Sequence, residues 1–156
     1  MIIVTLAYLV TPSEVWLAPK NKKVGVGLLN GYGGQVKEHE TIIQAALRET
    51  KEESRVEVSA KDLIHITTIN IFRGDEHRFQ CHIFLITRWG GEPQETEEMG
   101  IPEKFPRNKL PLARMLPGDS LWLPEVMIGR PIPQGGFVRY NKDMTRVIES
   151  HLPAAL

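Results

Sequence analysis

The segment from Gly34 to Val56 constrains this chain most, because it combines the start signal of an α-helix with a cluster of acidic side chains. Thr41 followed by Gln44 has the form of a capping box, which predicts a helix over residues 42–54. Ile43, Leu47 and Thr50 fall on one stripe of this helix, and Ala46 lies beside it. We expect this stripe to pack against the rest of the fold and the acidic side to face a cleft.

The acidic side carries Glu49, Glu52 and Glu53. At about 100° per residue, the three side chains share an arc of roughly 100° on the helix. Like charges at i and i+4 destabilise a helix unless a counter-charge is present. Carboxylate oxygens suit Mg²⁺ or Mn²⁺, and protein-bound Mg²⁺ commonly shares its coordination with substrate phosphates. A solvated acidic face is the plain interpretation, and a cation site for a phosphate substrate is the functional one.

Three glycines precede the helix, with Gly31, Gly33 and Gly34 placed around Tyr32. Glycine permits close approach of the backbone, so a carbonyl there can reach a metal or an amide can reach a phosphate. A glycine-rich turn alone is weak evidence, and the spacing of the glutamates behind it adds the specificity.

The combined pattern closely resembles the Nudix box of the Nudix hydrolases, with matching positions at Gly34, Glu40, Arg48-Glu49, Glu52-Glu53 and Val56. The resemblance implies that the Gly34 carbonyl, Glu49, Glu52 and Glu53 hold Mg²⁺, with Mn²⁺ as a possible substitute. Two positions depart from the pattern. Thr50 replaces an aliphatic residue, and Arg55 replaces the glycine that normally ends the helix, which puts the geometry of the helix end in question.

The composition fits one small enzyme domain over residues 1–156. Lys plus Arg equals Asp plus Glu at 19 each, which disfavours nucleic acid polymers and acidic membranes as partners. Cys81 is the single cysteine and cannot form an internal disulfide. No apolar run approaches the roughly 20 residues of a membrane span, and the N-terminus lacks a basic signal-peptide region. We expect a cytoplasmic protein that is a monomer or a homodimer.

Five segments rich in apolar or β-branched residues are predicted strands: 2–10, 14–18, 63–73, 79–89 and 137–140. The first two should be joined by a hairpin or close turn. Residues 90–106 are expected to be loop with a short strand near Met99. A helix is expected to open over 121–127 and to stop at Pro131 and Pro133, and residues 143–152 are expected to form a closing helix. This order indicates an α+β (mixed α/β) sandwich with a mixed sheet, as the Nudix resemblance also implies.

The resemblance extends along nearly the whole chain to the MutT-like branch, which includes oxidised-purine nucleoside triphosphatases. The sequence Asn30-Gly31-Tyr32-Gly33-Gly34 matches the motif that precedes the box there. Other matching positions, implied to lie at the active site, are Thr5, Lys20, Glu98-Met99 and the segment from Leu116 to Pro124 with Asp119 and Trp122.

Two departures bear on the base of a nucleotide substrate. Leu116 replaces a tryptophan that would stack on the base, and Gly118 replaces the first of two aspartates that read its edge. Base preference therefore need not match that of the resembling enzymes. Asn30 and Asp119 remain as a reading pair, although turn or capping roles are their plain alternatives. Trp122 is interpreted equally well as a core residue or as a border of the nucleotide.

The mechanism that follows is metal-assisted attack of water on an internal phosphorus of a nucleoside triphosphate, giving the monophosphate and pyrophosphate. Arg48 is expected to pair with Glu52 and hold it in place, or to form a purely structural salt bridge. The general base stays open among Glu49, Glu53 and Glu98.

Three functions stay open at this point. The leading one is hydrolysis of modified purine nucleoside triphosphates such as 8-oxo-dGTP, which would clean the nucleotide pool. The second is a Nudix hydrolase of another nucleoside diphosphate-linked substrate. The third is a module that binds a nucleotide without hydrolysing it, and such a module is expected to have lost carboxylates of the box.

Overall fold

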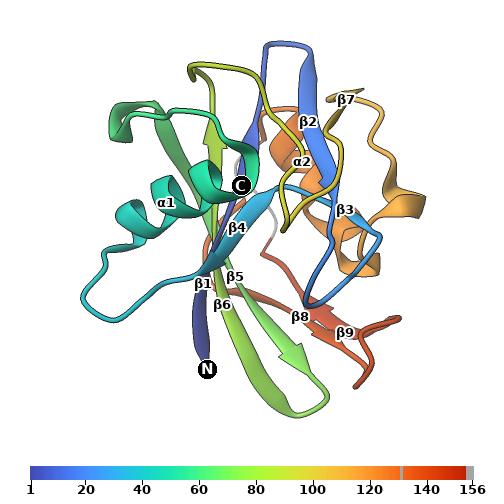
Figure 1. Cartoon of the computed structure of the whole chain (residues 1–156). Helices are drawn as coiled ribbons and strands as arrows, with labels where there is room; N and C mark the ends of the chain where they lie inside the picture. The colour runs from blue at the N-terminus through green and yellow to red at the C-terminus, as the bar shows by residue number, and fades with distance from the viewer. Residues whose placement is uncertain (131, 154–156) are drawn as a thin grey trace.

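The larger of two β-sheets forms the centre of the molecule, as the computed structural model, which describes residues 1–130 and 132–153, shows (Figure 1). Its strand order is β4-β1-β6-β5-β8-β9. The strands are β1 (Ile2–Leu9), β4 (Tyr32–Gln35), β5 (Leu63–Arg73), β6 (Glu76–Ile86), β8 (Gly136–Tyr140) and β9 (Val147–His151). β1 runs parallel to β6 and β5 runs parallel to β8, whereas the other neighbours are antiparallel. The predicted mixed sheet is confirmed.

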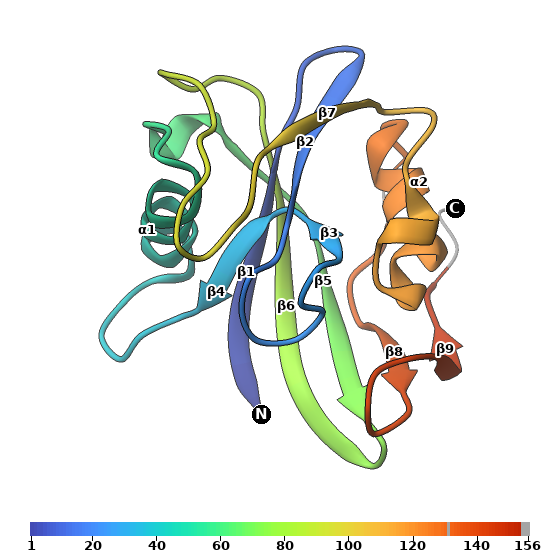
Figure 2. The ribbon, with the colours of Figure 1, turned by 45° about the vertical axis from the view of Figure 1, so that its right-hand side comes forward.

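The smaller sheet has the order β3-β2-β7 and is antiparallel. Its strands are β3 (Leu29–Asn30), β2 (Glu14–Pro19) and β7 (Glu103–Pro106). Helix α1 (Ile42–Ser54) lies on one side of the larger sheet and the short helix α2 (Leu123–Met127) on the other, and the smaller sheet is seen between the two helices (Figure 2). The layered arrangement of helices about a mixed sheet agrees with the predicted α+β sandwich.

The capping box forms as the sequence predicts and sets the start of α1. The Thr41 hydroxyl accepts a hydrogen bond from the Gln44 N–H at 3.0 Å, and the Gln44 side chain accepts one from the Thr41 N–H at 2.9 Å. The predicted helix bounds are therefore confirmed. The predicted packing stripe is only partly correct, because Ala46 and Thr50 are buried while Ile43 is 38% exposed.

The end of α1 is built on a residue other than glycine. Arg55 adopts a left-handed conformation with φ of 69°, and its N–H donates to the Lys51 carbonyl. A β-carbon in this region clashes with the backbone and costs roughly 1 kcal/mol. The family's glycine is thus replaced without loss of the terminating turn, at a local energetic cost.

Two apolar clusters hold the layers together, one on each face of the larger sheet. Alternation along β6 divides its side chains between them, since Ile83 and Leu85 join the cluster beneath α2 while Phe84 and Ile86 join the cluster beneath α1. The first cluster is the larger and includes Tyr8, and the second includes Tyr32. The second cluster packs against α1, and the first packs against α2. Because both clusters share the larger sheet, they fix the position of α1 relative to α2.

The turn between the first two strands is close, as predicted, but it does not form a hairpin within one sheet. β1 and β2 belong to different sheets and share only a bridge between Val10 and Val15. The predicted strand near Met99 is limited to a bridge with Lys20, and β7 forms within the segment that was expected to be loop. The strand predicted over 79–89 begins three residues earlier, at Glu76, and ends at Ile86.

The closing helix predicted over 143–152 is wrong. Residues Val147–His151 form β9, which pairs antiparallel with β8. Between these strands the Asn141 side-chain oxygen accepts hydrogen bonds from the N–H groups of Thr145 and Arg146. An asparagine that binds its own following backbone favours a turn over a helix, so the chain reverses direction here.

The helix predicted over 121–127 is shorter than expected, since α2 begins at Leu123 after a 3₁₀ turn over Pro117–Leu121. It ends at Met127, and Gly129 then takes a φ of 84°. The stop therefore precedes both prolines: Pro133 comes later in the chain, and Pro131 lies outside the described residues.

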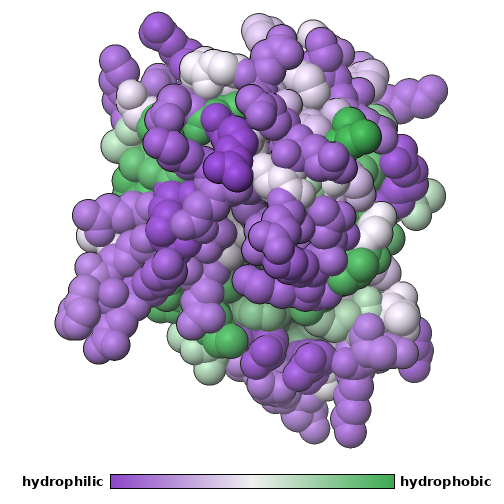
Figure 3. Space-filling view, viewed as in Figure 1, coloured by the Kyte–Doolittle hydropathy of each residue, from purple (hydrophilic) through white to green (hydrophobic). Residues whose placement is uncertain are grey.

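The face seen in Figure 3 is dominated by hydrophilic residues, in particular over α1 and the loop that precedes it. Within the part of the chain that the structure describes, none of the helices has the length and apolar character needed to cross a membrane.

Replacing Arg55 with glycine is expected to stabilise the fold by about 0.5–1 kcal/mol, because glycine adopts the left-handed conformation without the β-carbon clash. Arg55 is exposed, so few other contacts change. Urea denaturation of Arg55→Gly beside Arg55→Ala measures the effect. The alanine variant keeps the β-carbon and should gain nothing; equal stabilities for the two variants would contradict this account.

Candidate active site

Glu53 is the most enclosed of the three helix glutamates. It is 8% exposed, and its Oε1 accepts a hydrogen bond from the Gly33 N–H at 2.8 Å. Burial raises the pKa of Glu53 to about 7, and the negative charges of Glu49 and Glu98 act in the same direction. The Gly33 hydrogen bond and the positive charge of Lys20 oppose that rise in pKa. The carboxyl group is thus held at a defined place in an environment short of positive charge.

Close approach of β4 to its neighbours depends on glycine at two positions. A β-carbon at Gly33 would overlap the carbonyl oxygen of Thr5, and one at Gly34 would lie 2.5 Å from the carboxyl carbon of Glu49. The absence of these side chains lets β4 pair with β1 and lets the Glu49 carboxyl lie directly against the Gly34 backbone. The glycines of the motif therefore have a packing reason as well as a functional one.

Arg48 organises the acidic side chains around it. Its Nε and Nη2 donate to the two carboxyl oxygens of Glu40 at 2.7 and 2.9 Å, and Nη1 donates to Glu49 at 2.8 Å and Glu52 at 3.2 Å. Nη2 also donates to the Gln35 carbonyl at 3.0 Å. The bidentate pair with Arg48 holds the pKa of Glu40 well below its usual range, at about 2. The predicted pairing of Arg48 with Glu52 is present, and Glu40 acts as an orienting carboxylate.

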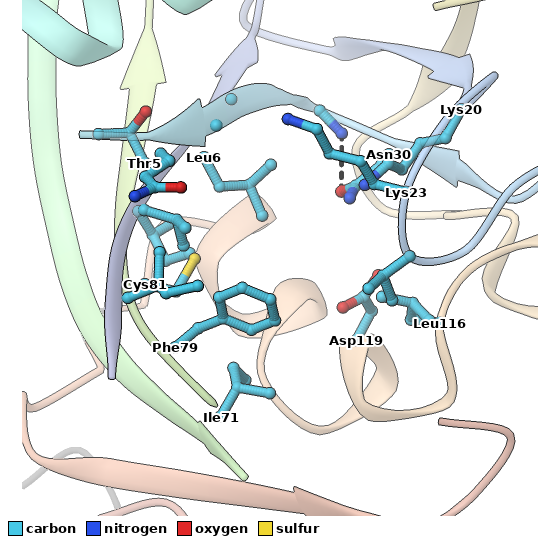
Figure 4. A pocket seen from close by; sticks show the side chains of 18 of the residues that line it. Thr5, Leu6, Lys20, Lys23, Asn30, Ile71, Phe79, Cys81, Leu116 and Asp119 are labelled. Carbon is cyan, nitrogen blue, oxygen red and sulfur yellow. Dashed lines mark hydrogen bonds between the residues drawn. The ribbon is translucent and has the colours of Figure 1, made fainter. Parts of the chain in front are cut away.

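A cavity of about 590 Å³ opens beside Glu53 and extends toward the 3₁₀ turn that precedes α2 (Figure 4). Gly33, Gly34, Glu53 and Glu98 line one part of it. An apolar wall from β5 and β6 includes Ile69, Ile71, Phe79, Cys81 and Ile83. Leu116, Asp119, Trp122 and Tyr140 also line the cavity, together with Asn30, Thr5 and Lys20. Every predicted substrate-binding residue therefore contributes to one cavity.

Of the predicted metal ligands, Gly34 and Glu53 line this cavity, whereas Glu49 and Glu52 do not. The Glu52 side chain is 53% exposed and turned to Arg48, while that of Glu49 is 14% exposed. Among residues 1–130 and 132–153, no three His, Cys, Asp or Glu side chains stand close enough to bind a metal as they are placed. The three glutamates thus lie on one side of α1, but they do not converge on one point. Arg48 binds the carboxyl groups of Glu49 and Glu52, and the Gly33 N–H binds that of Glu53.

The donors at this end nevertheless fit a hard divalent cation. They are carboxylate and carbonyl oxygens, which such ions prefer. Glu49 occupies a cradle that a side chain at Gly34 would fill, and Glu53 is a buried carboxyl whose raised pKa a nearby cation would lower.

Glu98 reaches the cavity from the loop before β7. Lys22 lies near it, with Nζ at 3.6 Å from a carboxyl oxygen, and the Glu98 carbonyl accepts a hydrogen bond from the Asn21 N–H at 3.0 Å. Since Glu98 also raises the pKa of Glu53, the two carboxyl groups share one electrostatic environment. The structure thus brings this distant glutamate to the acidic end of the cavity.

Lys20 lines the same cavity. Burial lowers its pKa, while Glu53 and Asp119 act to raise it. A single ammonium group is thus within electrostatic range of a carboxyl group at each end. This position suits a cation that contacts a polyphosphate chain.

Asn30 and Asp119 face the cavity from opposite segments of the chain. The Asn30 side-chain oxygen accepts hydrogen bonds from the Gly31 N–H at 2.9 Å and from the Tyr8 hydroxyl at 3.4 Å, which leaves its amide N–H₂ as the group for a ligand. Asp119 is 6% exposed, and its Oδ2 has no partner among the described residues. Burial raises the pKa of Asp119 to about 7. Figure 4 shows its carboxyl group turned toward the middle of the cavity.

The remaining predicted residues have mixed roles. The Thr5 hydroxyl is buried without a partner in the described residues and lines the cavity. Trp122 is 4% exposed and packs edge-on against Tyr8 at 6.3 Å between ring centroids, so it belongs to both the core and the cavity wall. Leu116 lines the cavity beside the loop that carries Gly25.

Sequence reasoning missed Tyr140, Lys22 and the apolar wall as parts of the site. The alternation of Phe79, Cys81 and Ile83 was a usable signal, since it predicts that these side chains share one face of a strand. Nothing in the local pattern indicates that β8 pairs with β5 and so brings Tyr140 to the cavity. That contact depends on the strand order alone.

Comparison with known proteins gives a consistent result. Residues 3–126 match the NUDIX domain. Two relatives, each called oxidized purine nucleoside triphosphate hydrolase, come from Danio rerio and Mus musculus. The first is 40% identical over 124 residues, covering 78% of this chain and 77% of that protein. The second is 37% identical over 120 residues, covering 77% of this chain and 76% of that protein.

A solved structure of a MutT protein from Bacillus halodurans superposes with a TM-score of 0.81 at 21% identity, covering 97% of each chain. A MutT NUDIX hydrolase from Burkholderia pseudomallei gives a TM-score of 0.64 at 18% identity, covering 70% of this chain and 86% of that one. At these identities the structural likeness bears on the fold, which agrees with the strand order and layers described above.

The raised pKa of Asp119 predicts a stability that falls with pH. The folded protein keeps this proton up to about pH 7, whereas the unfolded chain releases it near pH 4, so the stabilisation is complete below pH 4 and is lost as pH rises through 7. Between pH 5 and 7 the free energy of unfolding should fall more steeply for the wild type than for Asp119→Asn, by up to about 1.4 kcal/mol per pH unit. Urea denaturation across this range measures the slopes. Glu53 titrates in both proteins and cancels, and identical slopes would refute the assignment.

Proposed function

The chain belongs to the Nudix family of hydrolases that cleave pyrophosphate bonds, and we propose that its substrates are oxidised purine nucleoside triphosphates, which it converts to the monophosphate and pyrophosphate. The names of the relatives from Danio rerio and Mus musculus support this choice. At 40% and 37% identity over about three quarters of the chain, those two proteins are similar enough to suggest the substrate class.

One observation carries the proposal: a single cavity joins the acidic end of α1 to a polar end at Asp119 and Asn30, and Lys20 lines it within electrostatic range of both ends. A nucleoside triphosphate has the same order of chemical groups, since its polyphosphate needs cations and its base needs hydrogen-bonding groups on an apolar wall. The cavity volume of about 590 Å³ is in the range of small-molecule sites.

Members of this family use a divalent metal, and we propose Mg²⁺ here, with Mn²⁺ as a substitute. Glu49, Glu52, Glu53 and the Gly34 carbonyl would hold it. When bound, the ion neutralises phosphate charge and lowers the pKa of water. The oxygen-only donor set supports this choice over softer metals.

The chain's own residues have separable tasks in this proposal. Lys20 binds the phosphates, and Arg48 fixes the direction of Glu49 and Glu52 through its hydrogen bonds. The proton of the attacking water goes to Glu49, Glu53 or Glu98. The pKa of Glu53, which burial raises to about 7, suits a group that accepts a proton near neutral pH, although a bound cation would lower it.

A second candidate is a different nucleoside diphosphate-linked substrate. The observation that favours it is the base end of the cavity, where Leu116 supplies no aromatic face for stacking and Gly118 supplies no side chain. Stacking on an aromatic ring contributes roughly 1–3 kcal/mol per base in nucleic-acid proteins, so its loss relaxes base selection. We also propose that the protein acts in the cytoplasm on free nucleotides, where the reaction would remove damaged precursors from the nucleotide pool.

The test is pyrophosphate release from a panel of triphosphates, namely 8-oxo-dGTP, 8-oxo-dATP, dGTP and dATP, with a nucleoside diphosphate sugar added for the second candidate. We expect Mg²⁺-dependent release that is greatest for an oxidised purine. Glu53→Gln should lower kcat by at least about 100-fold, because it removes both a ligand and a possible proton acceptor.

Glu57→Gln is the matched control, since Glu57 is an exposed glutamate that pairs with Lys51 at 2.9 Å and does not line the cavity. Its activity should equal that of the wild type. Full activity under exhaustive chelation, or in Glu53→Gln, would refute the mechanism. Cleavage of the sugar nucleotide alone would favour the second candidate.

Arg48→Lys is expected to raise the Mg²⁺ concentration for half-maximal activity by roughly 10–100-fold, because lysine cannot reproduce the forked hydrogen bonds to Glu40 and Glu49. A magnesium titration of activity measures this shift. Arg114→Lys, at an exposed arginine that pairs with Glu103, should show none. An unshifted titration in Arg48→Lys would assign Arg48 to helix stability alone.

A further inference from the structure

The Tyr140 side chain fills the space that a side chain at Gly118 would need. Gly118 is buried in the 3₁₀ turn before α2, and a β-carbon there would overlap the Tyr140 hydroxyl and lie 2.8 Å from the ring carbon that bears it. Val138 Cγ1 would be 2.9 Å away. Any side chain at 118 is thus excluded by two residues of β8. The position where the resemblance leads one to expect a carboxylate is filled by the phenol of Tyr140 from β8.

Tyr140 is fixed in this place from both ends. It is the last residue of β8, where it pairs in register with Arg73 of β5, and it is 2% exposed. Its hydroxyl oxygen accepts a hydrogen bond from the Gly118 N–H at 3.0 Å, and the residue lines the cavity. The oxygen is therefore held at a defined point on the cavity wall.

The phenol proton is available to a ligand. Because the oxygen already accepts from Gly118, the hydroxyl must direct its proton elsewhere, and no acceptor in residues 1–130 or 132–153 forms a hydrogen bond with it. Burial and the charge of Asp119 raise the pKa of Tyr140, so the group stays protonated and remains a donor. A buried donor without an acceptor is costly, and a ligand that supplies one recovers that cost.

A second unpartnered group belongs to the same end of the cavity. Asp119 Oδ2 is buried without a hydrogen-bond partner in the described residues. Asp119 follows Gly118 directly, and its charge acts on the Tyr140 hydroxyl. The wall therefore offers a phenol donor near a carboxyl group, each lacking a partner that a ligand can provide.

We propose that Tyr140 is a specificity-determining residue, whose O–H donates to the ring carbonyl of a 6-oxopurine while Asp119 accepts from the adjacent ring N–H. This inference rests on the proposed function and narrows its substrate class. A 6-oxopurine presents an acceptor next to a donor, which complements this pair. A 6-aminopurine presents the reverse order, with an amino group toward the phenol proton and a ring lone pair toward the carboxylate. The pocket therefore favours oxidised guanine over oxidised adenine.

The test compares Tyr140→Phe with the wild type on two pairs of substrates, at a pH above 7 where Asp119 is ionised and can only accept. Both 8-oxo-dGTP and 8-oxo-dATP carry the 8-oxo group. dITP and dATP differ only at the 6-position and the adjacent ring nitrogen. We expect kcat/KM for 8-oxo-dGTP and dITP to fall roughly 10-fold, mainly through KM, with less than about a twofold change for the adenine nucleotides. Gly118→Ala should lose the same selectivity, because its β-carbon displaces the phenol.

Tyr32→Phe is the matched control. It removes a buried tyrosine hydroxyl that has no partner in the described residues, from the cluster beneath α1, and should leave the ratio of kcat/KM values unchanged. A purely structural role for Tyr140 would lower kcat/KM equally for both members of each pair. An equal fall, or no fall, overturns the proposal.

Failure of the proposed function gives a different result. If the wild type cleaves neither oxidised triphosphate, that function is wrong, and calorimetric binding of 8-oxo-dGMP and 8-oxo-dAMP then decides the role of Tyr140. Tighter binding of 8-oxo-dGMP that Tyr140→Phe abolishes supports it. Absence of any preference in the wild type, or a preference that survives in Tyr140→Phe, overturns it.

Discussion

The hydrogen bond from the Gly33 N–H to Glu53 is the contact on which the site depends. It joins the strand β4 to the last turn of α1 and holds a buried carboxyl group at the edge of the cavity. The bond requires that the helix and the strand lie close together. Glycine at 33 and 34 permits this, since a β-carbon at either position would overlap Thr5 or Glu49. Backbone packing and the acidic centre therefore have a common cause.

Electrostatics connect the two ends of the cavity. Burial raises the pKa values of Glu53 and Asp119 to about 7, and it lowers the pKa of Lys20, which lines the same cavity. Burial disfavours the charged forms of these groups in the free protein, whereas a cation beside Glu53 and a phosphate beside Lys20 would favour those charged forms. The charged groups of the free site thus lack counter-charges that a charged ligand would supply.

At the end of the cavity that holds Asp119, the Tyr140 side chain from β8 takes the place of the side chain that Gly118 lacks. Local comparison of the segment around Asp119 reveals only a loss, because Gly118 has no side chain. In three dimensions the vacated volume is filled by the Tyr140 phenol, which binds the Gly118 N–H. The cavity wall thus presents a phenol where the resembling enzymes have a carboxylate. Loss of a motif residue therefore need not mean loss of recognition.

The local pattern of the chain was enough to predict the bounds of α1, its capping box, the pairing of Arg48 with Glu52 and the mixed sheet, because these depend on spacings of three or four residues or on a family motif. The placement of Lys20, Glu98 and Asp119 around one cavity agrees with the resemblance, but their distances arise from strand order. The closing segment was mistaken for a helix, since its apolar spacing suits either structure and only pairing with β8 decides for a strand. The position of Tyr140 was likewise decided by tertiary contacts, because it depends on the pairing of β8 with β5 and not on neighbouring residues in the sequence.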